Sequence, residues 1–128
     1  MTLAQNTAVV LFLFALGLGF DTGNAQASGL VTFNITNNAR YTIFLKFFSQ
    51  NRSWVWPTAT SNYVLNDNKE HSIRLTCNIG EKICYGAGYS HDGTGSSWGV
   101  GFLGKLGCSG CCLTCAANNP THAWSLDD

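Results

Sequence analysis

The chain is poor in charged residues, and neither sign forms a cluster. Seven Lys and Arg stand against seven Asp and Glu in 128 residues, so the charged fraction is 11% and the formal net charge is zero. Soluble domains ordinarily carry about 25% charged residues. Binding to nucleic acid or to an anionic membrane requires clustered Lys and Arg. The composition therefore argues against a nucleic-acid partner.

A long apolar run is also missing. The uncharged stretch Ala8 to Phe20 has thirteen residues, whereas a membrane-spanning helix needs about 20. The stretch fits the apolar core of a signal peptide, and Ala25-Gln26-Ala27 supplies the small residues of a cleavage site. We expect residues 1–27 to be removed and residues 28–128 to be secreted or periplasmic, with no further membrane span. Because no Lys or Arg precedes the run, an uncleaved N-terminal anchor is the alternative.

Helical periodicity is absent from residues 28–128, and strand patterns take its place. Apolar residues alternate with polar ones in Val31 to Thr36 and again in His71 to Cys77, which is typical of half-buried strands. Further strands are expected at residues 41–48, 53–57, 82–89, 98–103 and 122–126. The strands at residues 31–36 and 41–48 are expected to form a hairpin. Turn residues separate them at short intervals, and no linker divides the chain. The sequence predicts one all-β domain, a β-sandwich with a Gly- and Cys-rich C-terminal part.

Six cysteines are the most specific feature of the chain: Cys77, Cys84, Cys108, Cys111, Cys112 and Cys115. The last four form C-x-x-C-C-x-x-C, a spacing that also suits a zinc or iron–sulfur site or a redox motif. In a small exported domain an even number of cysteines predicts structural disulfides. We expect three disulfides and no metal. Cys77 and Cys84 either face each other across a hairpin or each reach the C-terminal cluster, and the spacing does not decide between these options.

The motifs of common enzyme classes are absent. The chain contains no G-x-S-x-G, no H-E-x-x-H and no phosphate-cradling motif. A glycosidase needs two carboxylates roughly 5–9 Å apart, and the sequence offers no obvious pair, although distant loops could supply one. Asp67, Glu70 and Glu81 fall in expected turns, where a solvated acid is the default. His91-Asp92-Gly93 reads as a turn between strands. An enzyme is therefore less expected than a binding protein, and no cofactor is expected.

Aromatic residues are the best candidates for a binding site. Trp54 and Trp56 are two residues apart on an expected strand, so both rings point to one face. Exposed flat rings stack on sugar faces, and we expect Trp54, Trp56 and Trp98 to do so, with His91 and Asp92 hydrogen-bonding hydroxyl groups. The alternative is that these rings fill a small core.

Four segments resemble parts of thaumatin-like proteins, in the same order. Val31-Thr-Phe-Asn-Ile-Thr-Asn with Tyr41-Thr-Ile-Phe looks like that family's opening hairpin, and the later pieces start at His91, Gly107 and Ala123. The family is usually about twice as long and richer in cysteine, and only Asp92 matches its acidic cleft. The resemblance implies a β-sandwich that contacts cell-wall polysaccharide, without implying catalysis.

The leading hypothesis is a secreted, non-enzymatic β-sandwich that binds cell-wall or surface carbohydrate. A secreted protein-interaction factor (an effector, inhibitor or antimicrobial protein) is the first alternative, and a small glycan hydrolase is the second.

Overall fold

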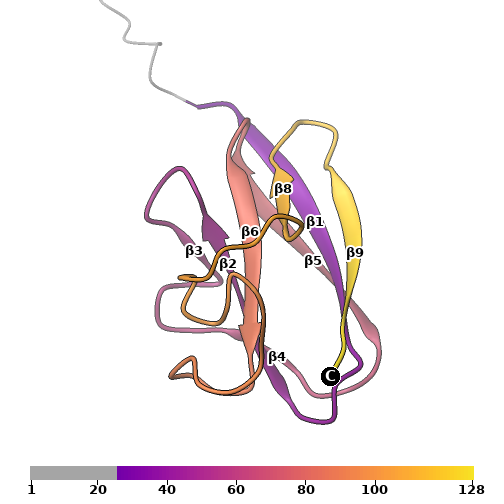
Figure 1. The fold of residues 1–128 in the computed structure, drawn as a ribbon. Coiled ribbons are helices and arrows are strands. Elements are labelled where there is room, and N and C mark those ends of the chain that lie inside the picture. The colour runs from indigo at the N-terminus through magenta and orange to yellow at the C-terminus, as the bar shows by residue number, and fades with distance from the viewer. Residues whose placement is uncertain (1–25) are drawn as a thin grey trace, which may run out of the picture.

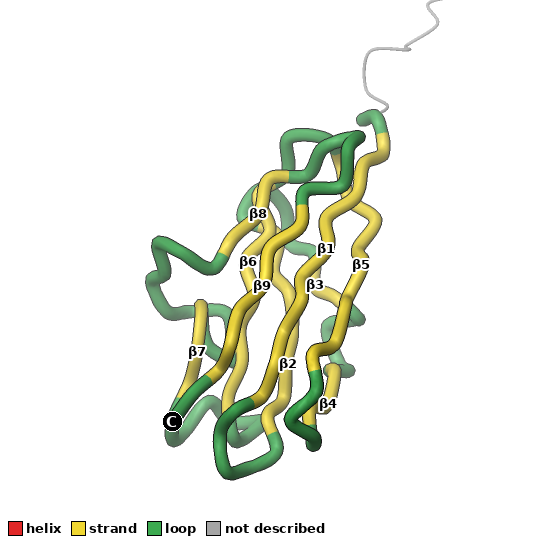
Figure 2. Tube along the Cα trace, turned by 90° about the vertical axis from the view of Figure 1, so that its right-hand side faces the viewer, coloured by secondary structure: helices red, strands yellow, loops and turns green. Residues whose placement is uncertain are grey.

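The computed structural model describes residues 26–128, so the expected leader lies outside the described residues apart from Gln26 and Ala27. These residues form two facing β-sheets connected by loops (Figures 1 and 2). No helix occurs among them. Consequently, this part of the chain holds no helix that is long and apolar enough to cross a membrane. The all-β, disulfide-linked sandwich expected from the sequence is confirmed.

The first sheet has three strands, with β1 (Ser28–Asn37) in the centre. Strand β5 (Glu70–Asn78) pairs with it in the antiparallel direction, and β9 (Thr121–Leu126) pairs with it in the parallel direction. Val31, Phe33 and Ile35 are completely buried. Their side chains share one face because successive residues of a strand point to opposite sides.

The second sheet has six strands, arranged around β2 (Ile43–Ser49) and β6 (Lys82–Gly88). The others are short: β3 (Val55–Trp56), β4 (Tyr63–Leu65), β7 (Ser97–Gly99) and β8 (Cys112–Thr114). On β2, Ile43, Leu45 and Phe47 are completely buried, which again places alternate residues in the core.

Aromatic contacts join the two sheets at the centre of the core. The ring of Phe33 on β1 lies 4.6 Å from that of Phe47 on β2 and stacks 5.2 Å from that of Trp124 on β9. Burying a side chain of this size contributes about 2–3 kcal/mol. Trp124 therefore belongs mainly to the core.

Two expectations about strand pairing and length are wrong. Strands β1 and β2 do not form a hairpin but lie in different sheets, and the loop between them is held by Asn37, which donates to the carbonyl oxygens of Tyr41 and Leu65. The strand expected at residues 98–103 ends at Gly99. Gly99 and Gly101 have φ angles of 61° and 75°, which an extended strand does not accommodate.

The structure has three disulfides. Cys77–Cys115 connects β5 of the first sheet to the residue that follows β8, Cys84–Cys112 joins β6 to β8 within the second sheet, and Cys108–Cys111 closes a local segment. Cys77 and Cys84 therefore each reach the C-terminal cluster and do not pair with each other. All six cysteines are paired in this way.

Candidate functional site

The loop that follows β2 is shaped by the Ser49 side chain. Its Oγ accepts hydrogen bonds from the backbone N–H groups of Asn51 and Arg52, both at 3.2 Å. The backbone N–H of Ser49 donates to the carbonyl oxygen of Trp54 at 3.0 Å, which closes the loop. A serine at the start of a turn acts in this way because its hydroxyl replaces a backbone acceptor. These hydrogen bonds fix the conformation of residues 51–54 at the end of the second sheet.

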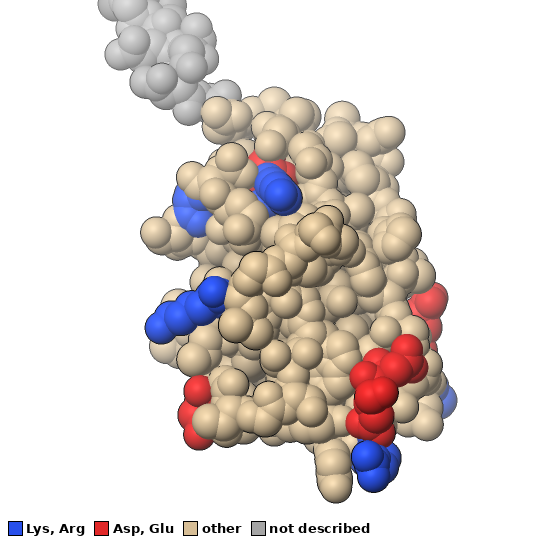
Figure 3. All heavy atoms as spheres, viewed as in Figure 1, with Lys and Arg blue, Asp and Glu red and all other residues tan. Residues whose placement is uncertain are grey.

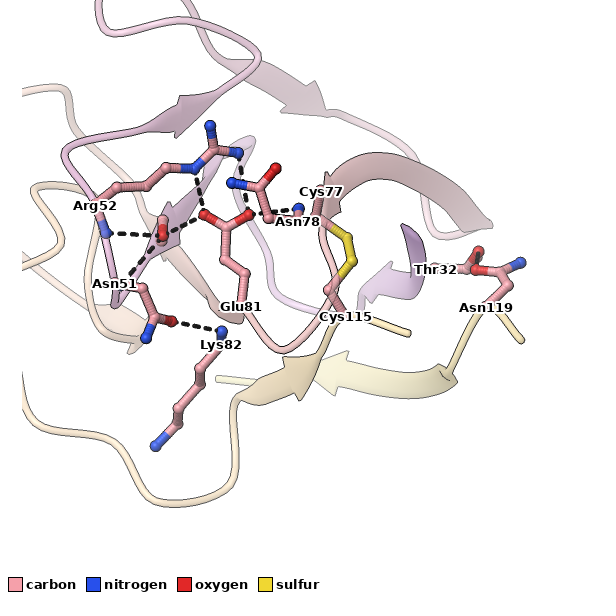
Figure 4. Close-up of a disulfide and its surroundings, with 10 residues drawn as sticks. Thr32, Asn51, Arg52, Cys77, Asn78, Glu81, Lys82, Cys115 and Asn119 are labelled. Atoms are coloured by element: carbon pink, nitrogen blue, oxygen red, sulfur yellow. Dashed lines mark hydrogen bonds and ion pairs between the residues drawn. A yellow bond between two sulfur atoms is a disulfide. The ribbon is translucent and has the colours of Figure 1, made fainter. Parts of the chain in front are cut away.

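The side chain of Glu81 contacts this loop through Ser49 and Arg52. Glu81 lies in the turn between β5 and β6, where Gly80 has a φ angle of 89°. Only 2% of the Glu81 side chain is exposed, and Arg52 binds both of its carboxylate oxygens through Nε and Nη2 (Figure 4). Ser49 Oγ and the backbone N–H of Asn78 donate to the same carboxylate. A two-point pair of this kind fixes the guanidinium plane as well as its position.

The ionisation of this pair follows from its contacts. Burial raises the pKa of Glu81, but the hydrogen bonds from Arg52, Ser49 and the Asn78 backbone lower it more, so the pKa lies below its usual value. The hydrogen bond to Glu81 raises the pKa of Arg52 against the opposing effect of burial. Both groups are therefore charged at neutral pH.

Two tryptophan rings flank the guanidinium of Arg52. Its Cζ lies 4.8 Å from the ring centroid of Trp54 and 5.8 Å from that of Trp56. Trp54 is 51% exposed, whereas Trp56 is 9% exposed. Both rings line an open groove of about 350 Å³, which Thr76 and Asn78 of β5 border on the other side. Trp54 thus offers a ring face to solvent, while Trp56 serves mainly as the base of the groove.

Arg52 also lines a second, more polar hollow. Asn51, Asn78 and Gly80 line this hollow, which also contains Glu81. Gln26 and Ile79 line it too. A guanidinium has five N–H donors, and Glu81 engages two, leaving three for a ligand. Asn51 accepts from the Lys82 backbone through Oδ1, which directs its amide nitrogen away from that bond.

The remaining sequence-predicted residues lie elsewhere, in two separate places. Trp98 is half-buried on β7, packs edge-on against Tyr89 and donates its indole N–H to the Asp127 carbonyl oxygen. The His91 ring is exposed and packs 4.0 Å from the Phe44 ring. The structure therefore brings Trp54 and Trp56 together but does not unite them with Trp98, His91 and Asp92.

Asp92 stabilises its own turn. Its Oδ1 accepts hydrogen bonds from the hydroxyl groups of Ser90 and Thr94 and from the Thr94 backbone. These contacts lower the pKa of Asp92 to about 2. A catalytic acid must hold a proton near neutral pH, so these contacts disfavour that role for Asp92.

Charges are sparse on the face of the domain shown in Figure 3. Lys and Arg are separated there by broad uncharged areas and form no basic patch. The distribution agrees with the low charged fraction of the chain.

Sequence reasoning missed the central pair of the site. Glu81 is buried and ion-paired, so the expectation of a solvated acid is wrong for this residue. Arg52 was not predicted as a site residue, because a single arginine in a polar loop has no distinguishing pattern. The available indications were its place two residues before Trp54 and the tight Asn78–Glu81 turn, but the contact between the two loops exists only in the folded chain.

Comparisons with family models, curated proteins and solved structures find no match to this chain.

The Glu81 pair predicts a specific acid sensitivity. Because folding lowers the pKa of Glu81 from an unfolded value of about 4.3, the unfolded state binds more protons in acid. The stabilisation is complete above about pH 5 and is lost as the pH falls through the folded pKa. Urea unfolding of the parent and of Glu81→Gln between neutral pH and about pH 2 tests this. The stability difference between the two is expected to shrink as the pH falls, and parallel curves would show that Glu81 is not the titrating group.

Proposed function

We propose that this chain is an exported, non-enzymatic β-sandwich that binds cell-wall or surface carbohydrate at the groove of Trp54, Trp56 and Arg52. The observation that carries the proposal is the exposed Trp54 ring beside a guanidinium that is already fixed by Glu81. Sugar rings present C–H groups on their faces and hydroxyl groups at their edges. An aromatic face with hydrogen-bond donors at its border complements both.

The site is organised before any ligand arrives. Arg52 is held by two hydrogen bonds to Glu81 and by contact with two indole rings. Binding then costs little side-chain entropy, since long side chains ordinarily lose rotamer freedom on contact with a ligand. Preorganisation of this kind supports recognition of a ligand such as a sugar, whose individual contacts are weak.

The charge balance of the site favours a neutral glycan. Arg52 is paired with Glu81, so the groove carries no excess charge to attract an anionic polymer. The neighbouring side chains Asn51 and Asn78 are amides, which donate to and accept from hydroxyl groups. We therefore assign neutral polysaccharide as the ligand class.

Export is the second part of the proposal. Three disulfides in a domain of this size support an oxidising compartment. The leader expected at residues 1–27 supports the same location, and the resemblance to thaumatin-like proteins supports a cell-wall ligand.

The test is to replace the exposed ring. Trp54→Ala is expected to weaken binding to insoluble cell-wall polysaccharide about tenfold, which corresponds to about 1.4 kcal/mol and to the upper range of an aromatic contact. The fold should survive, because half of the ring is already exposed. A pull-down that measures the free fraction of protein at several polysaccharide concentrations gives the affinity.

Trp98→Ala is the matched control, because this tryptophan lies on β7 and away from the groove. It should bind as the parent does. Equal binding by Trp54→Ala and the parent would refute the groove. A parent that binds no glycan but captures a protein would favour the interaction-factor alternative.

A further inference from the structure

The two outer edges of the three-stranded sheet differ in how they are covered. On the β9 side, Trp98 donates to the carbonyl oxygen of Asp127 at 2.9 Å and Trp124 donates to that of Gly110 at 2.8 Å. Tyr89 contacts Asp128 through its hydroxyl. These bonds tie the end of β9 to the second sheet and its loops. Strand β5 forms the opposite edge of the sheet (Figure 2).

The hydrogen-bond pattern identifies which backbone groups of β5 are unpaired. The Ile79 N–H donates to the carbonyl oxygen of Ala27, and these two residues are opposite each other when the register of β1 and β5 is extended by one residue. Hydrogen-bonded pairs alternate along an antiparallel ladder, so the odd-numbered residues of β5 are the ones that bond to β1. In an antiparallel pair the alternate residues point their N–H and C=O groups outward. These are Glu70, Ser72, Arg74 and Thr76, all exposed. Within residues 26–128 nothing pairs with their outward backbone groups. Strand β5 is therefore an open edge of the kind that pairs with another strand.

The charged residues on this edge have no partner within the part of the chain that the structure describes. Neither Glu70 nor Arg74 takes part in an ion pair there. Four residues along a strand separate them by about 13 Å, so they cannot pair with each other in one molecule. An antiparallel β5 strand from a second copy resolves this. When Ser72 of the two copies lie opposite each other, Glu70 of each copy lies opposite Arg74 of the other.

A hollow of mixed polar and apolar character lies beside the same edge. Its lining residues are Tyr63, Val64, Leu65, His71, Ser72, Ile73 and Arg74, and Val64 is 50% exposed. In the register described above, Ile73 of one copy lies opposite His71 of the other, so the second copy would cover part of this hollow. Charge complementarity and the cover of exposed residues such as Val64 thus point to the same arrangement.

We propose that two copies of this chain associate through β5 in antiparallel register about Ser72, which joins their three-stranded sheets into one. The interface is a single strand pair with limited apolar area, so it is weaker than a standard-sized interface. It is therefore expected to form only at high protein concentration.

Sedimentation velocity of the purified chain from micromolar to millimolar concentrations tests the proposal. The parent is expected to shift from monomer to dimer across this range. Ser72→Pro removes an outward N–H without touching the ladder to β1, as edge prolines do, and is expected to abolish the dimer while thermal unfolding stays cooperative. A parent that remains monomeric throughout, or a dimer that survives Ser72→Pro, would overturn the proposal.

A charge exchange tests the register. Glu70→Arg and Arg74→Glu each place like charges opposite each other twice in the dimer, and each is expected to weaken association about tenfold. The double variant Glu70→Arg/Arg74→Glu restores opposite charges and is expected to recover the parent affinity. Equal association by the parent and both single variants would contradict the register.

Discussion

Replacing Cys77 and Cys115 together by alanine is expected to lower the free energy of unfolding by about 4 kcal/mol. The bond closes a segment with a sequence separation of 38, and the chain-entropy relation gives about this value for a loop of that length. Both residues are also nearly fully buried, so the substitution removes core contacts as well. Thermal unfolding by circular dichroism should show a fall in Tm of roughly 20 °C for a domain of this size.

Cys108→Ala/Cys111→Ala provides the comparison. This disulfide has a sequence separation of only 3, so the same relation gives less than half the loss. If both pairs cost the same, the stabilisation does not arise from loop closure.

Arg52→Ala is expected to cost about 2–3 kcal/mol of stability and to weaken glycan binding. Removing one member of a buried pair costs about 3–5 kcal/mol, because the other charge stays behind without a partner. The loss expected for Arg52→Ala is smaller than this, because 36% of the Arg52 side chain is exposed and water can approach the site. Chemical unfolding at neutral pH measures the loss.

Two variants separate this effect from a general loss of surface charge. Arg40→Ala removes an ion pair to Asp128 whose arginine side chain is 77% exposed, and exposed pairs contribute at most about 1 kcal/mol. Arg52→Gln/Glu81→Gln leaves no buried charge and should be more stable than Arg52→Ala. An Arg40→Ala variant as unstable as Arg52→Ala would contradict the special role of the Glu81 pair.

The strands could be predicted from the sequence, but several pairings could not. Alternation at Val31, Phe33 and Ile35 shows which face of the strand is buried, and these residues are buried. The same pattern does not say which strand lies beside it. Strand β1 pairs with β5 and β9, a choice made by packing between residues far apart in the chain.

The site depended even more on distant contacts. Trp54 and Trp56 could be identified as neighbours from their spacing, although Trp54 lies in the loop just before the two-residue strand β3. Glu81 could not be, because its burial arises when the turn after β5 meets the loop after β2. The cysteine pairing was similarly open, since spacing alone permits both a local hairpin bond and the observed bonds to the C-terminal cluster.

The most direct test of the glycan site is an NMR titration of the ¹⁵N-labelled chain with soluble neutral cell-wall oligosaccharides. We expect the resonances of the Trp54 indole N–H, the Arg52 Nε–H and the side-chain amides of Asn51 and Asn78 to shift together and to saturate at one affinity. Trp98 and the turn at Asp92 should remain unchanged. Shifts centred on Trp98 or His91, or no shift with any oligosaccharide, would contradict it.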